Sequence, residues 1–149
     1  MTAGVLSQAV AKAREPAVLL TVRFLVDVRN LLALLRHWRW QLRQAPPLLA
    51  GGEVAAPLLT KLWADNDRGT FDRLAERLSP GWSPAFEPRT AEHHLLNGLG
   101  SRLRLAGRDP LGVGVILDTL WRDEMAARNH ALLQRSGDAA DDLPRGALL

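Results

Sequence analysis

Apolar residues recur at spacings of three and four along most of this chain, which is the pattern of helices that bury one face. The longest such stretch runs from Pro16 to about Gln44, and Pro16 suits the first turn of a helix. Its main apolar stripe consists of Leu20, Phe24, Val28, Leu31, Leu35, Trp38 and Leu42. Further apolar positions, among them Val18 and Val22, widen this stripe. The helix is therefore expected to pack against partners on more than one side.

Shorter helices are expected before and after this one. Residues 3–14 form one, and a second runs from about Glu53 to Trp63, with Pro57 in its first turn. Asp65 or Asp67 caps a third, whose apolar stripe is Phe71, Leu74, Ala75 and Leu78. The proline-rich segment 79–88 is expected to be a loop that Trp82 and Phe86 attach to the core.

Two helices are expected in the remainder. Thr90 caps one that ends at Ala106, before Gly107. Asp109 and Pro110 together signal the start of the last helix, which is expected to end near Gln134 before Gly137. Its inward-facing positions are expected to be Val113, Ile116, Leu117, Leu120, Trp121 and Ala127.

No stretch alternates with period two, so the expected fold is all-α. A length of 149 residues fits one domain, residues 1–149, with a partly ordered tail at 138–149. Residues 17–35 are long enough to span a bilayer, but Arg23, Asp27 and Arg29 interrupt them. Each central charge costs about 2.5–3.5 kcal/mol on insertion, so no membrane span is expected. No signal peptide is recognised at the N-terminus, and a cytoplasmic location is expected.

Composition excludes several classes of site. The chain has no cysteine, which excludes disulfides, thiol nucleophiles and cysteine-ligated metals. His93 and His94 are adjacent, whereas two metal ligands on one helix need a spacing of three or four. Gly112 and Gly114 are interpreted as helix-packing positions, because no phosphate-binding motif surrounds them. No catalytic, cofactor-binding or metal-binding residue is predicted.

Positive charge is concentrated in the first third of the chain. Residues 1–50 carry seven basic and two acidic groups, a net +5, whereas residues 51–149 carry twelve and fourteen, a net −2. The segment 36–40 mixes arginines with Trp38 and Trp40, as single-strand nucleic-acid sites do. A core Trp38 beside a solvated edge of Arg29, Arg36 and Arg43 is the favoured interpretation. A helical nucleic-acid-binding or adaptor module remains the alternative function.

Two long helices carry similar polar segments. Asp27, Arg29 and Asn30 precede a leucine pair at 34–35, and Glu124, Arg128 and Asn129 precede another at 132–133. Arg and Asn are costly to bury in mid-helix unless they are paired. The similarity is either chance among surface residues or a repeated helical unit whose polar pair makes the same contacts twice.

These segments resemble the C-subunit family of bacterial and archaeal V/A-type ATPases, which includes the eukaryotic d subunit. The similarity lies in four segments in order: 24–36 with its Asp-x-x-Asn, 48–54 with its Gly-Gly-Glu, 109–114 with Asp-Pro-Leu-Gly-x-Gly, and Glu124 through Asn129. Family members are about twice as long, and the matched part is their C-terminal half.

The resemblance implies a fold and a function. The fold would be about half of a pseudo-threefold funnel of helical bundles. The function would be that of a non-catalytic rotor subunit, which links the central stalk to the proteolipid ring that moves protons or sodium ions across the membrane. It would thus be peripheral to the cytoplasmic membrane face. Structural or interface roles are expected for Asp27, Arg29, Asn30, Arg36, Arg39, Arg43, Glu124, Arg128 and Asn129.

Overall fold

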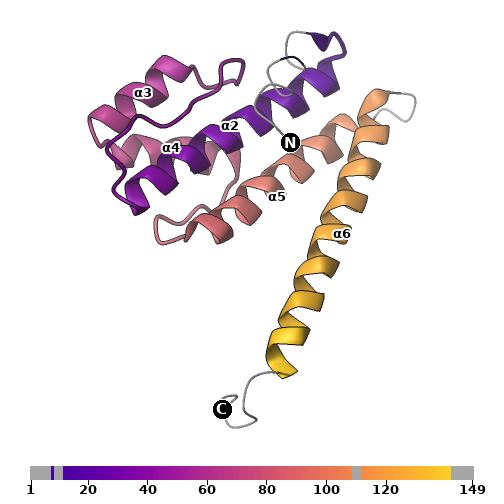
Figure 1. Cartoon of the computed structure of the whole chain (residues 1–149). Coiled ribbons are helices and arrows are strands. Elements are labelled where there is room, and N and C mark those ends of the chain that lie inside the picture. The colour runs from indigo at the N-terminus through magenta and orange to yellow at the C-terminus, as the bar shows by residue number, and fades with distance from the viewer. Residues whose placement is uncertain (1–7, 9–11, 109–111, 142–149) are drawn as a thin grey trace.

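The computed structural model describes residues 8, 12–108 and 112–141, and in these residues five helices pack as a bundle without strands (Figure 1). The helices are α2 (Pro16–Arg39), α3 (Ala56–Ala64), α4 (Arg68–Leu78), α5 (Pro88–Ala106) and α6 (Val113–Asp141). The all-α expectation is confirmed. The expected helix at 3–14 and the Asp109–Pro110 start signal fall largely or wholly outside the described residues.

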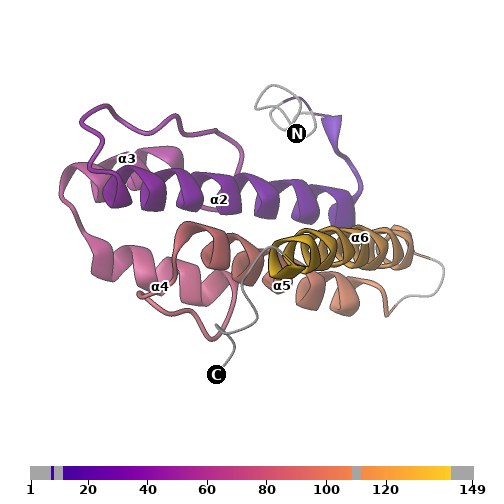
Figure 2. The same ribbon diagram turned by 60° about the horizontal axis from the view of Figure 1, so that its bottom comes forward.

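The core lies between α2 on one side and α4 and α5 on the other, with α3 beside one end of α2 (Figure 2). Phe24 and Leu31 of α2 and Leu95 and Leu99 of α5 are fully or almost fully buried. The predicted stripe of α4 is buried throughout. Trp38, Phe71, Trp82 and Phe86 form successive edge-on ring contacts, so the two aromatic residues of the 79–88 loop attach it to the core as expected.

Helix α2 ends five residues before the predicted Gln44. Gln41 adopts a left-handed backbone with φ of 50°, and the Leu42 N–H donates to the His37 carbonyl at 2.9 Å. The Gln41 N–H reaches the Trp38 carbonyl, which completes a Schellman motif. Leu42 therefore lies outside the helix and is exposed, so its place in the buried stripe is wrong. Glycine usually occupies the position of Gln41, which is why no residue type marked this end in advance.

Replacing Gln41 with glycine should raise the free energy of unfolding by about 0.5–1 kcal/mol, because glycine adopts a positive φ without steric cost. Asn66 provides a matched comparison, since it ends α3 in the same way with φ of 51°. Asparagine tolerates this conformation better than glutamine, so Asn66→Gly should gain less. Urea denaturation of both variants measures the difference. An equal gain at the two positions would contradict the argument.

The starts of three helices have three different causes. Asp67 caps α4 by accepting the Thr70 N–H at 2.9 Å, which confirms one of the two predicted caps. Helix α5 begins at Pro88, two residues before the predicted Thr90, because proline at the first position is preorganised for a helix. Helix α3 begins at Ala56 instead of Glu53, because the backbone of residues 53–54 is bound elsewhere.

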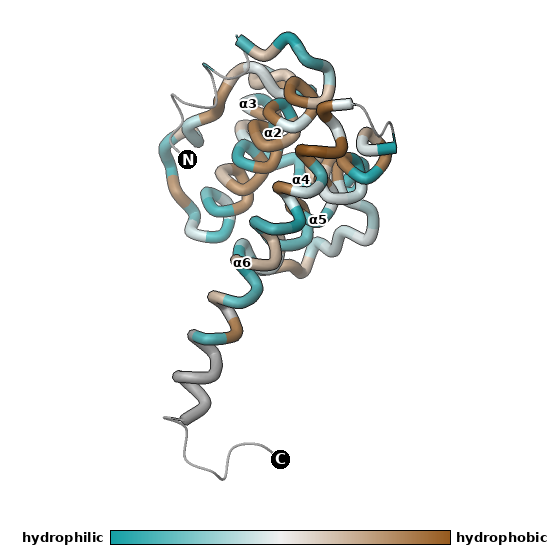
Figure 3. Tube along the Cα trace, turned by 90° about the vertical axis from the view of Figure 1, so that its right-hand side faces the viewer, coloured by the Kyte–Doolittle hydropathy of each residue, from teal (hydrophilic) through white to brown (hydrophobic). Residues whose placement is uncertain are grey.

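Helix α6 packs against α5 and α2 over its first half and then extends away from the bundle (Figures 1 and 3). It continues through Gly137 to Asp141, so the predicted end at Gln134 is wrong. Leu117 and Trp121 face the core as predicted. Ile116 and Leu120 are 58% and 59% exposed, and Val113 and Ala127 are exposed as well. Only one side of the helix meets the bundle, so the predicted inward face was too wide.

A close approach sets the corner between α5 and α6. A Cβ atom added to Gly114 would lie 2.3 Å from the Ala106 carbonyl oxygen. Gly114 is thus a helix-packing position, as the sequence indicated. Within the described residues, no helix is long and apolar enough to cross a membrane.

Candidate functional site

Two polar residues on the buried face of α2, Asp27 and Asn30, bind the backbone of the loop that follows α2. Both side chains are fully buried, at 0% exposure. The Asp27 carboxylate accepts the Glu53 N–H at 2.9 Å and the Val54 N–H at 3.1 Å. Because their spacing of three places them on one side of the helix, the pair acts on one segment of chain. We call Asp27 and Asn30 the α2 clamp.

Asn30 supplies the second half of the clamp. Its Nδ2 donates to the Leu49 carbonyl at 2.9 Å, and its Oδ1 accepts the Leu49 N–H at 2.8 Å. A side-chain amide has one donor side and one acceptor side, so it satisfies both backbone groups of a single residue. The backbone groups of Leu49, Glu53 and Val54 thereby gain partners at the partly or fully buried contact with α2. The clamp therefore replaces the secondary structure that this loop lacks.

Gly52 allows the loop to approach α2 closely. A Cβ atom added there would lie 2.0 Å from Asp27 Oδ1. Next to it, the Arg102 guanidinium of α5 pairs with Glu53 at 3.3 Å and lies over the Phe24 ring at 4.9 Å from the ring centre. Arg102 thereby joins α5 to both the loop and α2. The site is thus a three-way junction with a buried carboxylate at its centre.

Burial raises the pKa of Asp27 from 3.8 to about 6, because the charged form loses its water. The N–H bonds from Val54 and Glu53 oppose this rise. The nearby Glu53 carboxylate adds to it, and the Arg102 guanidinium lowers it. The Asp27 carboxyl group is consequently ionised at neutral pH but takes up a proton in mildly acidic solution.

A raised pKa in the folded state makes stability depend on pH with a definite sign. The folded chain binds a proton near pH 6 that the unfolded chain binds near pH 3.8, so the contribution of Asp27 to stability grows as pH falls through 6. We expect a gain of about 1 kcal/mol between pH 7 and 5.5. Urea denaturation at several pH values measures it. Subtracting the pH profile of unfolding free energy measured for Asp27→Asn removes the contribution of other titrating groups. Parallel profiles of the two proteins would show that Asp27 does not cause the pH dependence.

The arginines of the predicted edge, Arg29, Arg36 and Arg43, and the predicted interface residue Arg39 have different surroundings. Arg36 pairs with Glu92 at 3.2 Å and Arg39 pairs with Glu87 at 2.9 Å, so both connect α2 to the start of α5. Arg29 is exposed on the helix, and Arg43 lies beyond its end, so Arg43 does not belong to the predicted helical row. Trp38 packs against the core, as expected, and Trp40 is 61% exposed.

The second polar segment makes contacts of a different kind. Arg128 pairs with Glu124 at 2.7 Å, one turn away on the same helix, and both are about half exposed. Asn129 is exposed. The hypothesis that the two Arg-Asn pairs make the same contacts is wrong for the described residues, because α6 has left the bundle at this point. Asn30 binds a loop, and Arg128 binds its own helix.

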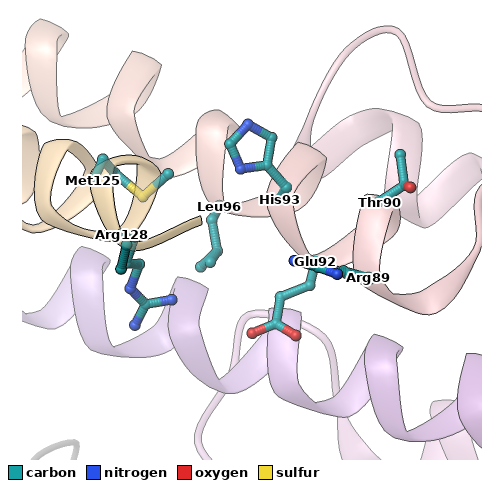
Figure 4. A pocket seen from close by; sticks show the side chains of 8 residues that line it. Arg89, Thr90, Glu92, His93, Leu96, Met125 and Arg128 are labelled. Atoms are coloured by element: carbon teal, nitrogen blue, oxygen red, sulfur yellow. The ribbon is translucent and has the colours of Figure 1, made fainter. Parts of the chain in front are cut away.

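A groove opens where α6 diverges from the other helices, and Figure 4 shows one side of it. One cavity of about 540 Å³ lies between α5 and α6, and a second of about 560 Å³ lies between α2 and α6. They share Glu92, Leu96 and Arg128, and together we call them the α6 groove. No pattern in the sequence indicates this groove, because it depends on the angle at which α6 leaves.

The two adjacent histidines considered as metal ligands, His93 and His94, have separate surroundings. His93 borders the α6 groove, whereas His94 contacts the Ser79 carbonyl through Nε2 at 3.0 Å and packs on Phe86. The described part of the chain holds no cluster of three His, Asp or Glu side chains placed to bind a metal ion. No family model, curated protein or solved structure matches this chain.

Proposed function

We propose that this chain is a non-catalytic coupling subunit of a rotary V/A-type ATPase, with a fold equivalent to about half of the funnel that connects the central stalk to the membrane ring. The proposal rests on the ordered segments that resemble the C-subunit family of these ATPases. As such a subunit it would be peripheral to the cytoplasmic membrane face and would act mechanically, by transmitting torque.

One observation supports the proposal most directly. Two of the segments that carry the resemblance, 24–36 and 48–54, contact each other through the four hydrogen bonds of the α2 clamp. The Asp and Asn of the first segment supply the side chains of these bonds, and the glycine pair of the second includes the position where a Cβ would strike Asp27. The two segments that carry the resemblance therefore pack together as one unit, in which the side chains of the first bind the backbone of the second.

The alternative of a nucleic-acid-binding module receives less support. Arg36 and Arg39 already pair with glutamates of α5. A surface that binds phosphates needs cations whose charge is available to the backbone of the nucleic acid. Along α2 and the segment just after it, this leaves Arg23, Arg29 and Arg43 without an acidic partner among the described side chains.

Affinity purification of the tagged full chain from membranes of its own organism, solubilised in mild detergent, tests the proposal. Proteolipid ring and central-stalk subunits should be recovered together in the eluate, as identified by mass spectrometry. Washing at high salt should release stalk subunits first if exposed arginines hold them. Recovery of neither class, with the chain itself intact in the eluate, would reject the proposal.

A further inference from the structure

The α6 groove has the lining of a binding site for a helix. Its floor is formed by partly or fully buried apolar side chains from three helices, namely Leu25, Val28, Leu32, Leu96, Trp121 and Met125. The walls are α2 and α5 on one side and the diverging α6 on the other (Figures 1 and 4). An apolar groove between helices is the surface that an amphipathic helix covers with its own apolar face.

The rim of the groove carries more positive than negative charge. Among the described residues that line it, Arg29, Arg36, Arg89 and Arg128 supply four positive charges, and Glu92 and Glu124 supply two negative ones, a net +2. Both glutamates are already occupied, Glu92 by Arg36 and Glu124 by Arg128.

Two cations are therefore available to a ligand. Among the described residues, Arg29 and Arg89 have no acidic side chain within ion-pair distance. Arg29 lies on α2 and borders one cavity, and Arg89 lies at the start of α5 and borders the other. Complementary charge on a partner must consequently be negative and must lie beside its apolar face.

We infer that the α6 groove binds an acidic amphipathic helix of a partner protein. The apolar face of that helix would cover the floor, and its Asp or Glu side chains would pair with Arg29 and Arg89. A basic helix is disfavoured by the same charges, so the rim selects its partner by sign. This inference rests on the groove alone and does not depend on the rotary ATPase proposal.

A displayed library of helix-forming peptides of about four turns, with apolar, acidic and basic residues at random positions, tests the inference with the full chain as bait. Enriched peptides should combine leucines at helical spacing with acidic flanks. Binding of one synthesised winner is then measured by fluorescence anisotropy. Its affinity should fall about tenfold or more in the Arg29→Glu, Arg89→Glu double variant.

The matched control is Arg73→Glu with Arg77→Glu, the same charge change on the exposed face of α4, which should leave affinity within about twofold. Met125 gives an independent reporter, since the chain has only two methionines and Met1 is the other. The winning peptide should shift the methyl NMR signal of Met125.

Several results would overturn the inference. They are the absence of enrichment, winners without acidic excess, an unshifted Met125 signal, or equal weakening by the α4 control. A Met125 signal that changes with protein concentration alone would assign the groove to a second copy of the chain. If an oligonucleotide shifts the Met125 methyl signal more than the peptide does, the groove would be assigned to nucleic acid.

Discussion

Replacing Asn30 with alanine is expected to lower the free energy of unfolding by about 3 kcal/mol. The variant leaves the N–H and C=O of Leu49 without partners at a site where the Asn30 side chain is fully buried. Each unsatisfied buried backbone group costs about 1–3 kcal/mol, and the cavity left by the amide adds to the loss. Urea denaturation followed by circular dichroism measures the change.

Asn129 provides the matched control, because it belongs to the second Arg-Asn pair but is exposed on α6. Asn129→Ala should change stability by no more than about 0.5 kcal/mol. Hydrogen exchange adds a local readout, since the Leu49 amide should lose its protection in Asn30→Ala while amides in the α4–α5 core lose much less. A loss below about 1 kcal/mol would show that the loop satisfies its own backbone without the clamp.

Gly52→Ala should be comparably destabilising, by about 3 kcal/mol, for a steric reason. The new Cβ would lie 2.0 Å from Asp27 Oδ1 and 2.9 Å from its Cγ, so either the loop or the carboxylate must move. Overpacking of this kind costs about 1–3 kcal/mol, and displacement of Asp27 adds the loss of its bonds to Glu53 and Val54. Denaturation of the purified variant gives the value.

Gly69→Ala controls for the chemical change itself. A Cβ at Gly69 meets nothing closer than 3.8 Å, so this substitution in α4 should gain about 0.5 kcal/mol from helix propensity. The cause of the loss at Gly52 is tested by repeating the substitution in Asp27→Ala. With the carboxylate absent, the additional cost should shrink by more than about 1 kcal/mol. If the stability losses of Gly52→Ala and Asp27→Ala simply added, the strain at Gly52 would not come from contact with Asp27.

Helical periodicity predicted the existence of the described helices because each buries a stripe against the core. Their ends depended on individual backbone geometries. The α2 terminus requires a left-handed Gln41, which no residue type marks in the sequence, and Gly137 allows α6 to continue although glycine often ends a helix. The outer face of α6 was predicted to be buried because periodicity does not reveal how much of a helix meets its neighbours.

The candidate site was predictable only in part. Asn30 was recognised as costly to bury without a partner, and both it and Asp27 are paired. Their partners are backbone groups 19 to 27 residues away, where no side chain in the sequence marks an acceptor or donor. The roles of Gly52 and the α6 groove depend on tertiary approach, which local patterns do not encode.

The projection of α6 has a consequence for how firmly its second half stays helical. From Ala126 onward the described side chains are exposed, so helix–coil balance there depends on intrinsic propensity and on pairs such as Glu124 with Arg128. A helical segment that depends mainly on propensity is marginally stable in water, and Gly137 weakens it further. A ligand seated against α6 would therefore shift this balance toward helix, so that part of its binding free energy is spent on ordering residues that it does not touch.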